Sequence, residues 1–361
     1  MMLAVTVRAQ LEGRYGSQGY QQIRTALEGY AEEANARLIA LDDAEDMTAM
    51  NLPAVTGAEA GTLLLSLRAV RGKLGNVDSI LLVGGDGIVP HWRMANPVAD
   101  RGVDPDPNVL SDNPYGTDAD SLEQYLAPPL AVGRLTDFAR GSAGDFVQLI
   151  NLATKSREAR TQRSGSVAVT SIDWSDYSHQ AAVALPAVAW YFSPGYLMNR
   201  GHGADADHEF LYFNLHGFDG KPDWSGYDSI QERFVTAVTP DAFEQQYVSG
   251  AVVFAENCYG AQTPGRTPSN SCALSLVQQG AAFVGATGLA FGSYLAPNFF
   301  LSDADALARS FWSEFTSGAK LGEALRRARA DYLNDPNTPE TNPFKQKTLL
   351  QFVLLGDPGW N

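Results

Sequence analysis

The chain has 361 residues, of which 45% are hydrophobic and 19% are charged. This composition supplies a large core and excludes wholesale disorder, and the length allows one large domain or two ordinary ones. The 41 acidic residues outnumber the 26 lysines and arginines, giving a formal net charge of −15. Such a charge argues against non-specific binding to nucleic acid or to an anionic membrane. The two cysteines, Cys258 and Cys272, are too few for a disulfide scaffold or a Cys-rich zinc site.

The sequence carries no targeting or membrane signal that we can identify. It has no run of about 18 apolar residues, the length that a transmembrane helix requires. The first residues, MMLAVTVRAQLEGRYG, lack the basic and apolar regions of a signal peptide. We therefore expect a cytoplasmic protein.

Strand-like and helix-like segments alternate along the chain. The predicted strands cover 3–7, 37–41, 79–83, 130–135, 166–172, 210–215, 251–255, 281–285 and 351–355. The predicted helices cover 18–36, 58–72, 137–157, 177–190, 240–248, 271–279, 303–316 and 319–333. Several strands are nearly continuous apolar runs, which is typical of strands covered on both faces. This alternation predicts an α/β fold with mainly parallel sheets flanked by helices.

Two segments interrupt the alternation. Residues 96–129 are rich in Pro, Asp and Asn and show little periodicity, which predicts a long surface excursion within the first half. Near 155–165 a polar helix end leads into a new strand. We place a boundary there, which gives an N-terminal α/β subdomain at 1–160 and a C-terminal subdomain at 161–361. Whether the two halves share one sheet or form two abutting sheets stays open.

Two strand ends in the second half carry reactive side chains. The apolar run LYFNLHGFDG (211–220) ends at His216 and Gly217, and AVVFAENCYGAQ (251–262) ends at Cys258. In parallel α/β sheets, ligands bind beyond the carboxyl ends of strands, so adjacent strands would bring His216 and Cys258 together. An imidazole can take the proton of a thiol and later protonate a leaving amine. The N–H groups of Gly217 and Cys258 are the candidates for holding the developing oxyanion.

These segments resemble the catalytic strand ends of the caspase-like (clan CD) cysteine peptidases, in which a His-Gly precedes a Cys on the next strand. Other segments are similar to the gingipain-type (peptidase C25-like) branch of that group, in the same order along the chain. They are ILLVGGDGIVP (80–90), SDNPYGTDAD (111–120), LAVGRL (130–135), GAAFVGATGLAFGS (280–293) and FVLLGDP (352–358). The resemblance implies a caspase/gingipain-like fold with two α/β subdomains, the second bearing a catalytic His216 and Cys258, and it implies a thiol protease acting on protein or peptide substrates.

The resemblance also places a specificity pocket around four residues. Glu256 lies two positions before Cys258, so strand alternation directs it to the same side as the nucleophile. Asp173 ends the strand at 166–172, a strand end that in the resembled fold contributes to the specificity pocket or to orienting the catalytic His. Thr287 and Ser293 follow the strand at 281–285 and are candidates for the pocket wall and for bonding the substrate backbone. Acids in a pocket favour a cationic partner, which predicts cleavage after Arg or Lys. The structural alternative is that Glu256 binds local backbone N–H groups and that Asp173 caps the helix at 177–190.

Several alternatives remain open at this stage. Cys272 begins a predicted helix and is the competing thiol, and His202 is the rival base. Arg266, in the loop after Cys258, is a candidate self-cleavage position. No cofactor is expected to be required and no metal site is assigned. A structural calcium ion is compatible with the acids of the excursion, although a solvated loop is the favoured interpretation of Asp100, Asp104, Asp106, Asp112, Asp118 and Asp120.

The resemblance further suggests a switched effector, with bacterial defence as one setting and an activating or inhibitory protein partner as one means of control. The leading hypothesis is a regulated intracellular cysteine endopeptidase. The alternatives are a catalytically silent caspase-like binding or scaffold module and an enzyme that hydrolyses a small amide.

Overall fold

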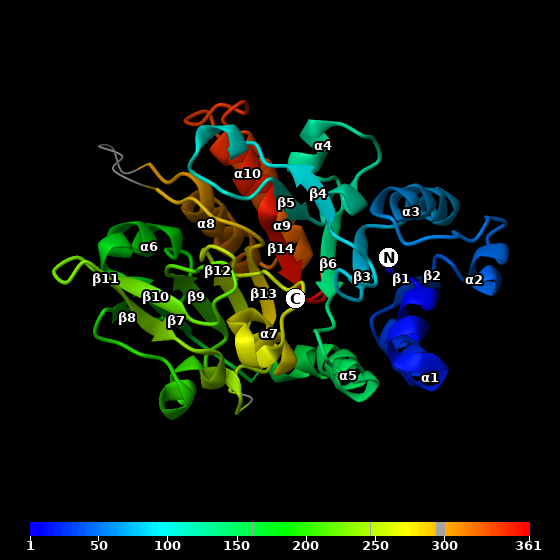
Figure 1. The fold of residues 1–361 in the computed structure, drawn as a ribbon, viewed down its shortest axis with the longest axis horizontal. Coiled ribbons are helices and arrows are strands. Elements are labelled where there is room, and N and C mark those ends of the chain that lie inside the picture. Colours follow the sequence, from blue (N-terminus) through cyan, green and yellow to red (C-terminus); the bar gives the residue numbers. More distant parts are fainter. Residues whose placement is uncertain (161, 246, 294–299) are drawn as a thin grey trace.

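One large sheet organises the whole molecule. The computed structural model describes residues 1–160, 162–245, 247–293 and 300–361. Within these residues the large sheet has ten strands, which Figure 1 shows running through the middle of the molecule. In spatial order they are β2 (Ala36–Ala40), β1 (Met2–Thr6), β3 (Ser79–Val83), β6 (Ala131–Leu135), β14 (Phe352–Leu355), β13 (Ala282–Ala286), β12 (Val252–Ala255), β9 (Phe210–Asn214), β7 (Ser166–Ser171) and β8 (Val188–Ser193).

The sheet consists of two parallel halves joined by one antiparallel pair. Neighbouring strands are parallel except β13 and β14. Because β14 is parallel to β6, the strands of the first half run opposite to those of the second half. The halves therefore share one continuous sheet, which the sequence left open. The connection from β3 to the adjacent parallel strand β6 must return from the carboxyl ends of the strands to their amino ends. This connection contains the segment 96–129.

Helices cover both faces of the sheet. One core cluster contains Leu211, Val253 and Phe283 from the strands together with apolar residues of α1, α3, α5 and α7. The opposite strand positions, such as Tyr212 and Phe254, pack with α6, α8 and α9 in a second cluster. The helices are α1 (Arg8–Glu33), α2 (Ala44–Thr48), α3 (Ala60–Leu74), α4 (Leu122–Leu126), α5 (Ala143–Arg160), α6 (Ser175–Ala181), α7 (Cys272–Gln278), α8 (Asp303–Thr316), α9 (Leu321–Leu333) and α10 (Pro343–Gln351). Successive side chains of a strand point to opposite faces of the sheet. Because helices cover both faces, the side chains on both faces of these strands are apolar.

All nine predicted strands are present, whereas several other segments differ from prediction. The helix predicted at 177–190 ends at Ala181, because Pro186 cannot continue a helix, and the aromatic residues that follow form β8. The helix predicted at 240–248 is only a short 3-10 helix (Pro240–Phe243). Two hairpins, α2, α4 and α10 were not predicted. The hairpins are β4 (Trp92–Ala95) with β5 (Asn108–Ser111) and β10 (Trp224–Asp228) with β11 (Arg233–Val238).

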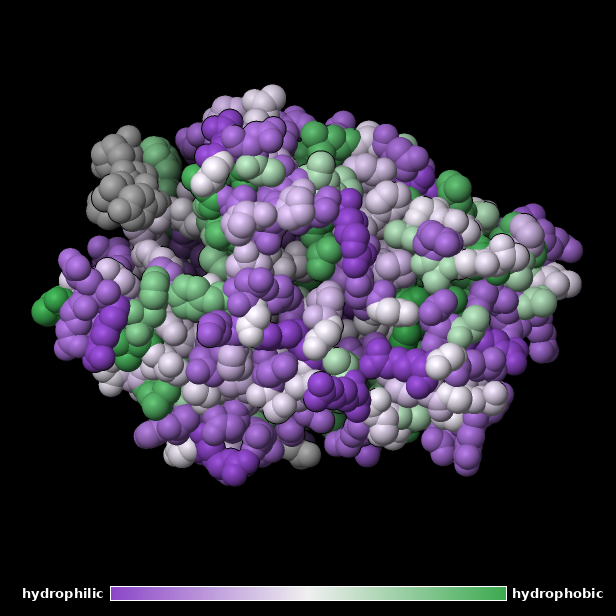
Figure 2. All heavy atoms as spheres, viewed as in Figure 1, coloured by the Kyte–Doolittle hydropathy of each residue, from purple (hydrophilic) through white to green (hydrophobic). Residues whose placement is uncertain are grey.

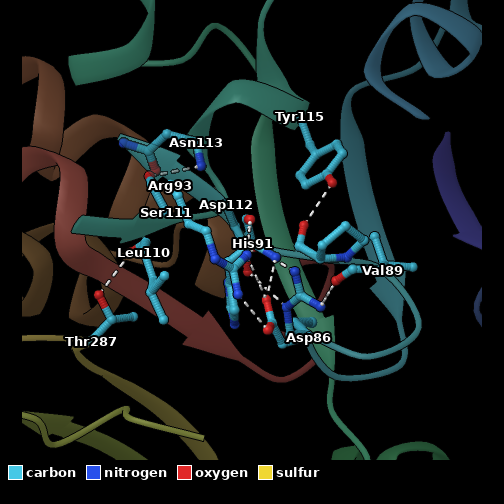
Figure 3. Close-up of polar contacts among 12 residues, drawn as sticks. Asp86, Val89, His91, Arg93, Leu110, Ser111, Asp112, Asn113, Tyr115 and Thr287 are labelled. Carbon is cyan, nitrogen blue, oxygen red and sulfur yellow. Dashed lines mark hydrogen bonds and ion pairs between the residues drawn. The ribbon is translucent and has the colours of Figure 1, made fainter. Parts of the chain in front are cut away.

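The segment 96–129 is more than a surface excursion. It contains β5 and α4, and it buries Asp104, Asp112 and Tyr115. It also packs on the second half, since the carbonyl oxygen of Leu110 accepts a hydrogen bond from Oγ1 of Thr287 at 2.7 Å (Figure 3). The Asp and Asn residues of this segment suggested a solvated surface loop. That prediction was wrong because each buried acid binds a specific side chain of the protein.

The surface is mostly polar, with apolar residues scattered among charged ones in the view of Figure 2. Of the helices that the structure describes, none combines the length and the apolar character needed to cross a membrane.

Candidate active site

The two reactive strand ends lie side by side. β9 and β12 are adjacent parallel strands, with Ala255 in register with Phe213. His216 follows the end of β9, and Cys258 follows the end of β12, so both lie at the same edge of the sheet. A Cβ atom on Gly217 would lie 1.9 Å from the carbonyl oxygen of Cys258, so the two backbones are in direct contact. Only glycine fits at position 217, which explains the His-Gly pair in the sequence.

The turn after β12 holds Cys258 in a fixed position. Tyr259 has a left-handed backbone (φ 55°), and its N–H donates to the carbonyl oxygen of Gly288 at 2.7 Å. The N–H of Ala261 donates to the carbonyl oxygen of Ala286 at 2.7 Å. A non-glycine residue in this conformation is strained and persists where its surroundings hold it in place.

Backbone N–H groups converge on the half-buried thiol of Cys258. The N–H of Ala290 lies 3.3 Å from Sγ. Burial raises the pKa of this thiol, while the N–H groups of Ala290, Cys258 and Gly217 act in the opposite direction. The thiol is therefore neutral at neutral pH, and its pocket is already lined by donors that favour negative charge.

His216 is held by its backbone and by aromatic rings. Its N–H and carbonyl groups both pair with Ser225 of β10, at 2.7 and 2.9 Å. The centre of its ring lies 4.2 Å from that of Trp174 and 4.8 Å from that of Phe234. Burial lowers the pKa of His216 to about 4. Among the described residues no carboxylate is hydrogen-bonded to this ring, so packing orients the imidazole.

A cavity of about 210 Å³ opens beside Cys258. Its walls come from the ends of β9 and β12, from the 290–293 loop and from the start of α8. The lining residues are Trp174, Tyr177, Asn214, Leu215, Glu256, Cys258, Ala290, Phe291, Gly292, Ser293, Ala304 and Asp305. This set contains two acids and no Lys or Arg.

The two acids of the cavity are hydrogen-bonded to each other. Burial raises the pKa of Glu256 well above its ordinary value, and the nearby charge of Asp305 raises it further. The pKa of Asp305 is also raised, mainly by burial, while the N–H of Ser293 at 2.6 Å stabilises its charged form. Tyr212 donates its hydroxyl hydrogen to Oε1 of Glu256 at 2.5 Å. Both shifts therefore favour the retention of a proton by this pair.

The structure brings some of the predicted pocket residues together and not others. Glu256 and Ser293 line the cavity with Cys258, as strand alternation predicts for Glu256. Asp173 does not: it is exposed on a 3-10 helix (Ile172–Trp174), and its neighbour Trp174 lines the cavity instead. Thr287 is buried and binds Leu110 rather than lining the cavity.

Asp305, Trp174 and Phe291 are site residues that the sequence did not reveal. Asp305 lies in the first turn of α8, where Asp303 is an equally plausible acid in the sequence. Trp174 follows Asp173 immediately, and nothing in the local pattern distinguishes which of the two faces the cavity. These contacts depend on tertiary packing rather than on local periodicity.

The loops that follow the two strand ends are bound to each other. The guanidinium group of Arg266 donates to the carbonyl oxygens of Gly220 at 2.7 Å and Lys221 at 2.6 Å. The side chain of Gln262 donates to Oδ1 of Asp219 at 2.7 Å. Arg266 therefore connects the loop after Cys258 with the loop after Gly217.

The competing thiol and base lie elsewhere. Cys272 is buried, burial raises its pKa well above the ordinary value, and its Sγ donates to the carbonyl oxygen of Pro222. His202 is exposed, and its Nδ1 lies 3.3 Å from Oδ1 of Asn199.

Acids of the 96–129 segment pair with basic side chains. Lys347 binds Asp104, and Arg71 and Arg68 bind Asp118 and Asp120. Asp112 accepts hydrogen bonds from Arg134 and lies 2.8 Å from Nδ1 of His91. Figure 3 shows Asp112 beside His91. The part of the chain that the structure describes has no group of three or more His, Cys, Asp or Glu side chains able to hold a metal ion. A structural calcium ion stays an untested prediction.

The ten-stranded, mostly parallel sheet, with helices on both faces and a candidate site beyond two adjacent strand ends, defines an α/β fold of the caspase/gingipain type. Residues 191–361 match the model of peptidase family C25, which confirms the resemblance to the gingipain-type cysteine peptidases. A solved structure described as "Structure of Protease" is similar to 99% of this chain and 77% of its own, with a TM-score of 0.58 and 12% identity. At that identity the similarity supports the fold alone. A comparison with curated proteins gives no match.

Proposed function

We propose that this protein is a cysteine endopeptidase that cleaves after Arg or Lys, using Cys258 as nucleophile and His216 as general acid and base. The family match over residues 191–361 supports a cysteine peptidase acting on protein or peptide. The observation that carries the finer proposal is the acidic cavity beside Cys258. Glu256 and Asp305 lie within it, and its described lining residues include no Lys or Arg. A cationic side chain of a substrate supplies the partner that this buried charge lacks.

In the proposed reaction, the thiol of Cys258 and the imidazole of His216 are both uncharged at the start. His216 takes the proton of Cys258 as Sγ forms a bond to the carbonyl carbon of the scissile peptide. The N–H groups of Gly217 and Cys258 hold the resulting oxyanion, and their effect on the thiol pKa supports this role. His216 then gives its proton to the departing nitrogen as the C–N bond breaks, leaving a thioester on Cys258.

Hydrolysis of the thioester completes the cycle. His216 takes a proton from water as the water oxygen bonds to the acyl carbon. The C–S bond breaks, the acid product leaves, and the proton returns to Sγ. The low pKa of His216 keeps its neutral form available as the base at neutral pH.

Control inside a cell is a further part of the proposal. An intracellular enzyme with this dyad needs restraint, and a regulating protein partner is one means of providing it. This part rests on the resemblance to the caspase-like peptidases alone.

The test is a panel of fluorogenic peptides that differ only in the residue before the scissile bond, with Cys258→Ala as the matched inactive variant. We expect turnover after Arg and Lys, no turnover after Asp, and complete loss in the variant. Turnover that survives in Cys258→Ala would exclude the proposed nucleophile. Labelling of Cys258 without cleavage of any peptide would favour hydrolysis of a small amide, and neither labelling nor cleavage would favour a binding module.

A further inference from the structure

A set of aromatic side chains extends from His216 to the protein surface. The ring of Phe234, on β11, lies 4.8 Å from the His216 ring and 4.8 Å from the ring of Phe218. The ring of Tyr227, on β10, lies 5.3 Å from that of Phe234. We call Phe218, Tyr227 and Phe234 the aromatic surface. Figure 2 shows apolar residues among polar ones over the β10–β11 hairpin, on the left of the view.

This surface faces solvent beside the candidate base. Phe234 is 50% exposed and Phe218 is 36% exposed. None of its three members lines the cavity beside Cys258. Contiguous exposed aromatic side chains are uncommon on a soluble protein without a binding role, because burying them against a partner is favourable.

The chemistry of the proposed reaction determines which part of a substrate meets this surface. The residue before the scissile bond places its side chain in the acidic cavity. The nitrogen of the next residue leaves with a proton from His216, so that residue must lie beside His216. Trp174 contacts the His216 ring and lines the cavity, whereas Phe234 contacts the same ring and does not line the cavity. The side chain that follows the scissile bond is therefore directed toward Phe234.

We propose that the aromatic surface is the binding site for the substrate residue that follows the scissile bond, and that it selects an apolar or aromatic side chain there. This inference rests on the proposed function. Its occupant is a peptide substrate with a basic residue followed by an apolar one. Phe234 is the specificity-determining residue, since it contacts both His216 and Phe218.

The test uses internally quenched peptides with Arg before the bond, which differ only in the next residue: Phe, Leu, Gly or Asp. We expect kcat/KM for Phe and Leu to exceed that for Asp by about tenfold, the lower end of what apolar contacts give. In Phe234→Ser the ratio should fall to about twofold, while Phe234→Tyr should retain it. Ile230→Ser is the matched control, because Ile230 is 93% exposed at the hairpin tip and lies outside the aromatic surface.

A second measurement separates this inference from the proposed function. A peptidyl-Arg chloromethyl ketone carries no residue after the scissile position, so its rate of reaction with Cys258 measures the dyad separately from the aromatic surface. Because Phe234 also packs on His216, a lower rate in Phe234→Ser reports that contact, and the preference among the four peptides is compared as a ratio within each protein. Labelling of the wild type by this ketone, together with a flat preference of the wild type among the four peptides, would overturn the aromatic surface and leave the proposed function standing. Neither labelling nor cleavage would overturn both.

Discussion

The carboxyl groups of Glu256 and Asp305 are hydrogen-bonded to each other within the cavity that opens beside Cys258. Both groups are almost fully buried. None of the described residues that line the cavity is basic, so the shifted pKa values favour a proton on the pair in place of a cation. A substrate Arg or Lys would displace this proton as it binds. The pair therefore predicts a pH-dependent contribution to stability and, under the proposed function, a contribution to specificity.

Replacing Glu256 by Gln should change how stability depends on pH. The pKa of Glu256 is raised in the folded state, so the wild type binds more protons when folded and loses stability as the pH rises through that pKa. Glu256→Gln removes this titration and should melt several degrees above the wild type at alkaline pH, with the difference shrinking as the pH falls. Thermal melts from pH 5 to 9 measure this. Glu123→Gln, at an exposed position on α4, is the control and should follow the wild type. Parallel curves for Glu256→Gln and the wild type would contradict the shared proton.

Replacing Asp305 by Asn should weaken the selection of a basic residue. A hydrogen bond to a charged group contributes about 1.5–3 kcal/mol, so kcat/KM for Arg and Lys substrates should fall about 10- to 100-fold. Turnover of a peptide with an uncharged residue before the bond should stay within about twofold. Asp303→Asn is the control, because Asp303 lies two positions earlier on α8 and does not line the cavity. An equal loss on charged and uncharged peptides would indicate damage to the fold instead.

The pH dependence of activity should reflect the burial of His216. Since its pKa is lowered to about 4, the acid limb of kcat/KM should lie near pH 4 rather than near the ordinary value of 6.5. Folding stability should also fall as the pH drops from 6.5 toward 4, because the unfolded chain takes up the proton more readily.

Trp174→Ala tests the cause of that shift. Removing the ring that packs on His216 admits water and should move the acid limb toward 6.5. Trp190→Ala is a matched control, since Trp190 stacks on His179 instead. An acid limb that stays near pH 4 in Trp174→Ala would show that this ring does not set the pKa of His216.

The sequence predicts the position of the candidate dyad because both strands are continuous apolar runs that end abruptly in a reactive residue. Alternation along β12 then places Glu256 on the side of Cys258, and the structure agrees. Asp305 could not be predicted, because it reaches the cavity from a helix whose packing no local pattern encodes. The segment 96–129 was misjudged for the same reason: its acids resemble a solvated loop until Lys347 and Arg134 are placed beside them.

Arg266 should act as a positioning residue rather than as a self-cleavage site. Its guanidinium group binds two carbonyl oxygens of the loop after Gly217, and its own carbonyl oxygen accepts the N–H of Ala139 at 2.8 Å. With both ends held in this way, the bond after Arg266 cannot extend into a neighbouring active site while the loop is folded. We expect the wild type to keep its intact mass during incubation, and a nick between 266 and 267 would contradict this.

Arg266→Ala releases the loop that carries Gly217, so the alignment of the oxyanion donors should deteriorate. We expect kcat to fall about tenfold with KM nearly unchanged, because a positioning defect acts in the transition state. Arg266→Lys should recover only part of this loss, since an ammonium group lacks the planar fork that reaches both carbonyl oxygens. Arg309→Ala removes an exposed arginine of α8 and serves as the control. A rise in KM with unchanged kcat would instead assign Arg266 to substrate binding.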